Sequence, residues 1–165
     1  MVGIMDRVGP VIQSALDSAV QTLTEDGRPV DGVVSMQPGN TVAWDNCCEN
    51  GGTLWARLIS LVPKYAKDKT PCMISVQVRF AVGVVRCVHV VDDDGSGPTE
   101  AEMDEDTLQV TKDADALFRS IQDNGWDGTY LFSRSLRIET GTPLGPEGNC
   151  AGFEWTASAQ VLMVN

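Results

Sequence analysis

One segment of this chain alternates apolar and polar side chains over an unusual length. Every second residue from Ile74 to Val84 is apolar, and small or polar residues occupy the positions between them. Side chains of a strand point alternately to its two faces, so a period of two predicts a half-buried β-strand. The strand either ends near Val84 or continues to Val91, and Gly83 would then mark a bend or bulge.

Two other segments have the period of a helix. Over residues 4–23, apolar side chains recur every three or four positions, which predicts an amphipathic helix. Pro10 interrupts this pattern, so the helix either begins near Pro10 or contains a kink there. A second, longer helix is expected after Thr99, because Glu102 completes a capping box. It should end at Asn124-Gly125.

Shorter runs predict the remaining strands and the loops. The strands are expected at residues 30–36, 53–62, 130–140 and 153–163. Glycine, proline and asparagine predict long loops at residues 24–52 and 141–152, and a basic connection is expected at 64–71. Helices and strands are segregated along the chain. We therefore expect one α+β domain over residues 1–165, an antiparallel sheet with two helices packed on one face.

Charge and length exclude several classes of function. The chain has 165 residues and a net charge of −11, so phosphate backbones and anionic membrane surfaces would repel it. No apolar run approaches the roughly 20 residues that a membrane-spanning helix needs. The first residues lack the features of a secretory signal, so we expect synthesis in the cytosol.

Five cysteines are present, and two of them, Cys47 and Cys48, are adjacent. The odd number and the lack of a C-x-x-C pair are not typical of a small secreted disulfide protein. A disulfide between this pair and Cys150 remains open. Zinc could use Cys87 and His89 with another cysteine, but the paired short spacings of zinc sites are missing. We therefore expect no metal and no cofactor.

The region that precedes the second helix is strongly acidic. Eight acidic residues and no basic ones lie between Asp92 and Asp106, where the helix dipole favours negative charge. A calcium loop that begins at Asp92 fails, because Met103 stands where a bidentate glutamate is required. No nucleophile elbow, phosphate-binding loop or zinc-protease motif occurs. We expect no catalytic residues and no enzymatic activity.

Two segments have a distinctive sequence. Residues 44–58 read WDNCCENGGTLWARL, and residues 143–155 read PLGPEGNCAGFEW. Both resemble head-to-tail connector proteins of tailed phages that infect actinobacteria. Residues 82–87 and the acidic stretch into the second helix fit the same pattern, so the resemblance covers roughly residues 40–160.

The order of the elements also resembles siphophage tail terminators. This resemblance implies a structural virion protein that forms a hexameric ring at the tail–neck junction, capping the tail tube and joining it to the neck. It further implies assembly in the host bacterial cytoplasm. The implied partners are other copies of the chain, the major tail tube protein and a neck stopper or connector protein. DNA would pass through the lumen without specific binding, and no membrane would be involved.

Two alternatives remain open. The first is a stopper or adaptor of the same neck, although an adaptor would be mostly helical and a stopper closer to a small β-barrel. The second is a small metal-binding protein that uses cysteines and His89. The long loops and the adjacent Cys47 and Cys48 depart from what a minimal terminator needs.

Subunit contacts are expected where segments project from the ends of strands and helices. The acidic turn and the predicted 141–152 loop are the two candidate regions, and plain solvated loops are the alternative for both. The candidate contact residues are Asp92, Asp93, Asp94, Pro143, Leu144, Glu147 and Asn149.

Overall fold

A computed structural model describes residues 3–39, 42, 44, 47–65, 73–126, 131 and 135–163. Within them, three helices and five strands follow one another in the order helix, strands, helix, strands, which confirms the predicted α+β class. The bounds are α1 Ile4–Glu25, β1 Val33–Gln37, α2 Cys47–Asn50, β2 Thr53–Tyr65, β3 Met73–Cys87, α3 Glu100–Gln122, β4 Arg137–Glu147 and β5 Cys150–Leu162.

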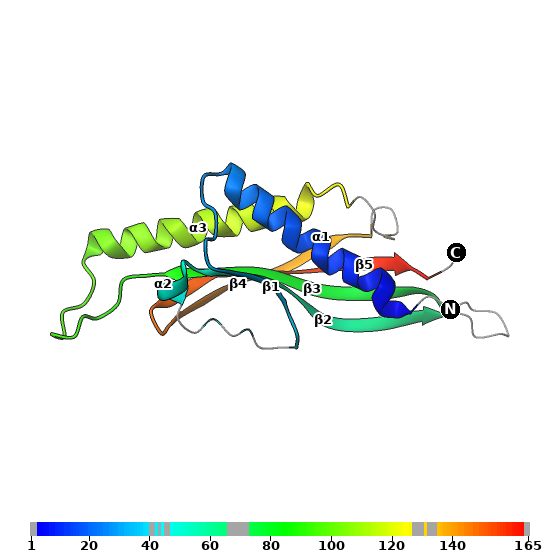
Figure 1. The fold of residues 1–165 in the computed structure, drawn as a ribbon, viewed down its shortest axis with the longest axis horizontal. Coiled ribbons are helices and arrows are strands. Elements are labelled where there is room, and N and C mark those ends of the chain that lie inside the picture. Colours follow the sequence, from blue (N-terminus) through cyan, green and yellow to red (C-terminus); the bar gives the residue numbers. More distant parts are fainter. Residues whose placement is uncertain are drawn as a thin grey trace.

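The five strands form one sheet in the order β1-β2-β3-β5-β4 (Figure 1). β2, β3, β5 and β4 pair antiparallel, but β1 pairs with β2 in parallel. The expectation of an antiparallel sheet is therefore wrong at this edge, and the sheet is mixed. The physical reason is the connection, because 15 residues separate Gln37 from Thr53. A segment of that length, which contains α2, permits the crossover that a parallel pair requires.

The long strand predicted from the alternating pattern is β3, at the centre of the sheet. It spans 15 residues and ends at Cys87 rather than Val91. Val76, Val78 and Phe80 are fully or almost fully buried, as the period of two requires. They belong to the main core, which also contains the buried stripe of α1, the C-terminal half of α3 and the apolar side chains of β2 and β5.

Gly83 does not form the expected bend or bulge. It pairs in unbroken register with Trp55 on β2 and with Glu154 on β5. A Cβ at Gly83 would lie only 2.3 Å from Cζ2 of the Trp55 ring. The glycine therefore provides space for a buried indole in the middle of a regular strand.

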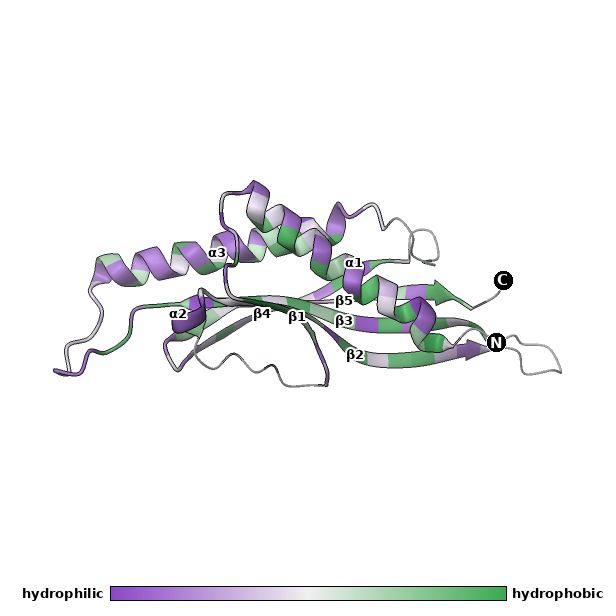
Figure 2. Ribbon diagram, in the orientation of Figure 1, coloured by the Kyte–Doolittle hydropathy of each residue, from purple (hydrophilic) through white to green (hydrophobic). Residues whose placement is uncertain are grey.

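α1 begins before Pro10 and contains it, and Gly27 with a φ of 71° follows its end. α3 begins after Thr99, whose hydroxyl accepts a hydrogen bond from the Glu102 amide, so the predicted capping box is confirmed. In Figure 2 the N-terminal half of α3 is largely hydrophilic, whereas β2 and β3 are largely hydrophobic. Only the C-terminal half of α3 has buried side chains.

Both predicted long loops are in part regular structure. β4 covers Arg137–Glu147 instead of residues 130–140, and β5 begins at Cys150, so the 141–152 region is mostly a β-hairpin. Proline suggested a loop there, but β4 is an edge strand, where a missing N–H is tolerated. The 24–52 region contains β1 and the short helix α2. Tyr130 and residues 66–71 of the basic connection lie outside the described residues.

Candidate subunit-contact site

The two predicted contact regions lie at the same end of the molecule. Cys87, the last residue of β3, pairs with Cys150, the first residue of β5. The chain after β3 and the turn before β5 therefore leave the sheet together (Figure 1). The Val88 amide, directly after β3, donates a hydrogen bond of 2.9 Å to the carbonyl of Asn149 in that turn.

A groove of about 630 Å³ opens between the N-terminal half of α3 and the β4–β5 hairpin. Its wall includes two of the predicted contact residues, Pro143 and Leu144, together with Phe153 of β5. Met103 of α3 forms part of the opposite wall, and its side chain is 50% exposed. The structure thus places apolar side chains from two distant segments around one open groove.

The polar rim of the groove contains the only histidine of the chain. The His89 backbone amide donates to a carboxylate oxygen of Asp106 at 2.8 Å, and its Nδ1 lies 3.1 Å from the other oxygen. Both residues line the groove. This pair fastens the segment after β3 to the side of α3.

The acidic turn is closed by hydrogen bonds among its own residues. The Asp92 amide donates to the Ser96 carbonyl at 2.8 Å, and the Gly95 amide donates to the Asp92 carbonyl at the same distance. The Ser96 hydroxyl and amide donate to the Asp94 carboxylate, which lowers the pKa of Asp94. Asp92, Asp93 and Asp94 are all exposed, so the turn presents negative charge to its surroundings.

The other two predicted contact residues differ in their roles. Glu147 is exposed at the end of β4 and is free to face a partner. Asn149 has a positive φ of 66° in the turn, and its carbonyl accepts from the Val88 amide and lies 3.3 Å from Sγ of Cys48. Its backbone therefore stabilises this end of the molecule.

Basic side chains lie toward the opposite end of the sheet. Lys64, near the end of β2, pairs in register with Ser75, and Arg137 begins β4. Both are exposed and line a polar depression of about 220 Å³ on the sheet. Neither has an ion-pair partner among the described residues. The acidic turn follows the other end of β3. Ser75, the register partner of Lys64, lies about 40 Å before Cys87 along the strand. Arg137 is level with Arg79 through Ser158, about 26 Å before Cys87.

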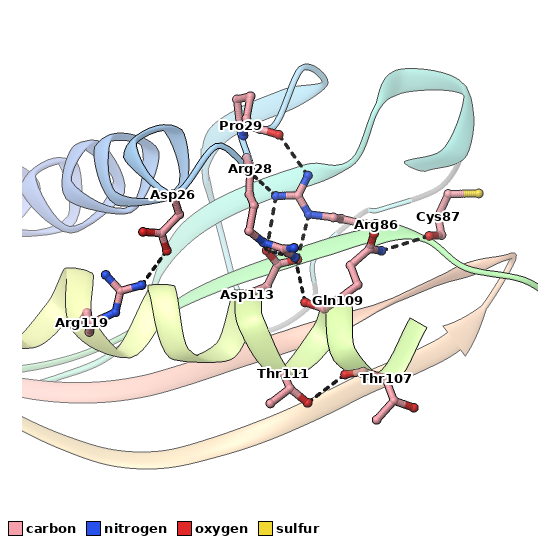
Figure 3. A network of polar contacts seen from close by, with 10 residues as sticks. All are labelled: Asp26, Arg28, Pro29, Arg86, Cys87, Thr107, Gln109, Thr111, Asp113 and Arg119. Atoms are coloured by element: carbon pink, nitrogen blue, oxygen red, sulfur yellow. Dashed lines mark hydrogen bonds and ion pairs between the residues drawn. The ribbon is translucent and has the colours of Figure 1, made fainter. Parts of the chain in front are cut away.

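Sequence reasoning missed a buried charge network, drawn in Figure 3. The Asp113 carboxylate on α3 is 1% exposed and accepts hydrogen bonds of 2.8 Å from Arg28 and Arg86. Arg28 also donates to the Gln109 carbonyl, and Arg86 donates to the carbonyls of Arg28 and Pro29. The network joins α3, β3 and the segment after α1. The sequence contained one signal, because Asp113 lies three residues after Val110 and four before Leu117, and residues at this spacing share one face of a helix.

A second missed network lies on the sheet face to which Trp55 points. The Glu154 carboxylate accepts from the Trp55 indole N–H at 2.8 Å and from two guanidinium nitrogens of Arg57 at 2.9 and 2.6 Å. Glu154 is buried, and its hydrogen bonds raise the pKa of Arg57. The charge is therefore compensated where water is largely excluded.

The four cysteines that the structure describes form a compact cluster beside this network. Cys47 is bonded to Cys150 and Cys48 to Cys87, which resolves the pairing left open by the sequence. Cys47 and Cys150 belong to a small second core with Trp55 and Val85. The sequence left open, as an alternative, a zinc site that uses Cys87 and His89. In the structure Cys87 is bonded to Cys48, and the His89 ring contacts Asp106 on α3.

The chain matches no protein-family model, and no curated protein is similar to it in sequence. Among the helices that the structure describes, none is both long enough and apolar enough to cross a membrane.

Proposed function

We propose that the protein is a structural virion protein of a siphophage, a tail terminator whose copies form a ring that caps the tail tube and joins it to the neck. The observation that carries this proposal is the apolar groove between α3 and the β4–β5 hairpin. Apolar surface of this kind, rimmed by polar residues, is typical of a site that a protein partner covers. Its walls include Pro143 and Leu144, which lie in a segment that resembles phage connectors.

The distribution of charge supports a contact between unlike surfaces of identical copies. The acidic turn at one end and Lys64 and Arg137 toward the other end are complementary. Such a head-to-tail contact is heterologous, and it generates a closed ring when its rotation closes. The acidic surface would also keep DNA from binding as it passes through the lumen.

The architecture favours a terminator over its neighbours in the neck. A sheet accompanied by two long helices, drawn on the same side of it in Figure 1, fits the resemblance to terminators. We propose that these helices form one layer over one face of the sheet. An adaptor would be mostly helical, and a stopper would be closer to a small β-barrel. In this role the protein needs no cofactor and catalyses no reaction, and its partners are the tail tube and a neck connector protein.

A matched pair of substitutions on α3 tests the groove. Met103 lines it with a side chain 50% exposed, whereas Leu108 is 54% exposed and lies outside it. We expect Met103→Glu to place a charge in the contact and to weaken self-association by at least roughly tenfold, about 1.4 kcal/mol. Leu108→Glu should leave it unchanged. Light scattering after size exclusion measures both, and equal behaviour of the two variants would contradict the proposal.

The neck stopper or adaptor remains the second candidate, because the segments around Trp44 and Pro143 resemble head-to-tail connectors in general. Position in the particle separates the two functions. A terminator lies against the last ring of the tail tube, whereas an adaptor lies next to the portal.

A further inference from the structure

Four cysteines from three segments meet at one place in the fold. Cys47 and Cys48 are the first residues of α2, Cys87 ends β3 and Cys150 begins β5. The Sγ atoms of Cys47, Cys48 and Cys150 all lie within 4.8 Å of one another, and Sγ of Cys87 is bonded to that of Cys48. We propose that, with its disulfides reduced, this cluster binds one Zn²⁺ through four thiolates.

The spacing suits such a site. Four sulfurs that bind zinc at about 2.3 Å in a tetrahedron lie about 3.8 Å apart. Because a sulfur–sulfur bond is about 2.0 Å long, each bonded pair has to separate by roughly 1.8 Å after reduction, which rotation of the cysteine side chains can provide. A set of four sulfur ligands in tetrahedral geometry is the set that selects zinc over magnesium or calcium.

The scaffold holds these residues together without help from the sulfur–sulfur bonds. Cys87 and Cys150 are opposite each other in the β3–β5 ladder. α2 is fixed by the hydrogen bond of 2.8 Å from the Gly52 amide to the Cys47 carbonyl, and the Val33 amide of β1 donates to the Gly52 carbonyl at 3.1 Å. We therefore expect the four thiols to remain neighbours after reduction.

The cysteine cluster is buried on one side and exposed to solvent on the other. Cys47 and Cys150 are buried against Trp55, Val85 and Leu144, whereas Cys48 and Cys87 are exposed. A metal ion can thus enter from solvent and be shielded on its inner side, as the hydrophobic shell of a stable site requires. His89 is not part of this set, because its ring contacts Asp106.

Zinc binding to this cluster takes place in two steps, reduction of the disulfides and coordination of the metal ion. A phosphine reduces each disulfide to two thiols and becomes a phosphine oxide by taking the oxygen of water. Binding of Zn²⁺ to the four thiols then releases four protons, and no electron is transferred in that step. Affinity should therefore fall as the pH is lowered.

Cobalt(II) titration of the reduced protein, freed of phosphine under anaerobic conditions, tests the site. We expect thiolate-to-cobalt charge-transfer absorption that saturates at one equivalent and disappears when Zn²⁺ is added. Cys47→Ser and Cys150→Ser should each lower the affinity by at least roughly 100-fold. Cys72→Ser and His89→Gln are the matched controls and should bind cobalt as the unaltered chain does.

Circular dichroism on the same samples covers the possibility that reduction unfolds the chain. In that case Zn²⁺ should restore the folded spectrum, because binding free energy becomes folding free energy. Absence of charge-transfer absorption in a folded reduced chain would overturn the proposal. So would failure of Zn²⁺ to refold an unfolded one, or cobalt binding that survives Cys47→Ser. The isolated chain suffices, so the result is independent of the proposed function.

Discussion

Asp113 is the residue on which the position of three segments depends. Its buried carboxylate accepts hydrogen bonds from the guanidinium groups of Arg28 and Arg86, and Arg86 also donates to the carbonyls of Arg28 and Pro29. Removing one partner of a buried ion pair strongly destabilises the folded protein, because the remaining charge stays buried and uncompensated. The network explains how the segment after α1 is held against β3 and α3 (Figure 3).

Asp113→Asn should therefore lower the free energy of unfolding by about 3 kcal/mol. The matched control is Asp115→Asn, two residues further along α3, where the carboxylate is 68% exposed and pairs with Arg119 on the surface. That change should cost less than about 1 kcal/mol. Urea denaturation followed by tryptophan fluorescence compares the two, and equal losses would contradict the importance of the buried network.

Gly83 is a second residue at which the contacts predict the effect of a substitution on stability. Gly83→Ala would bring a methyl group within 2.3 Å of the Trp55 ring, which is fully buried and cannot move without disturbing Glu154. We expect a loss of about 1–3 kcal/mol in unfolding free energy. Gly97→Ala, at a glycine with open space around it, should change little. A neutral Gly83→Ala would show that the indole packs differently.

The elements differ in how far the sequence predicts them. β3 and the start of α3 follow from local patterns, the period of two and the capping box. The parallel pairing of β1 does not, because it depends on a crossover rather than on its own residues. The strand predicted at residues 130–140 differs from β4, Arg137–Glu147. Pro143 and Pro146 indicate a loop unless the strand is known to lie at the edge of the sheet.

The candidate site was predictable only in part, because it depends on contacts between segments that are distant in the sequence. The acidic turn and the hairpin were expected to project, and they do lie at one end of the sheet. The groove requires the N-terminal half of α3 to lie beside the β4–β5 hairpin, and no local sequence pattern establishes that contact. The cysteine pairing likewise depends on the register that places Cys87 opposite Cys150.

The N-terminus of α3 offers a pH test at the scale of an element. The backbone amide and the hydroxyl of Thr99 donate to Glu102, and these hydrogen bonds lower the pKa of Glu102. A carboxylate whose folded pKa is lowered stabilises the fold above its ordinary pKa and loses that effect as pH falls through the folded pKa. Stability should therefore decline as the solution is acidified below about pH 4.5.

Thr99→Ala should cost about 1 kcal/mol near neutral pH, because it removes the N-cap. It should also raise the pKa of Glu102 toward its ordinary value, since the hydroxyl donor is lost. NMR titration of the Glu102 side chain measures this directly. An unchanged pKa in the variant would show that the cap does not act on this carboxylate.

At the scale of the whole molecule, charge is separated along the sheet. The acidic turn and the first half of α3 lie at one end, and Lys64 and Arg137 lie toward the other. If copies meet through these surfaces, raising the salt concentration from about 0.05 to 0.5 M should weaken association roughly tenfold. Arg137→Glu should have a similar effect at low salt, and Lys112→Glu on α3 should not. Analytical ultracentrifugation measures the association in each case, and association that does not change with salt would contradict a contact between these charged surfaces.

The most direct test is an electron cryomicroscopy map of the neck in virions that carry this chain. The account predicts a closed ring of identical copies between the last ring of the tail tube and the neck, with the groove of each copy covered by its neighbour. A chain that is strictly monomeric and absent from purified virions would contradict it.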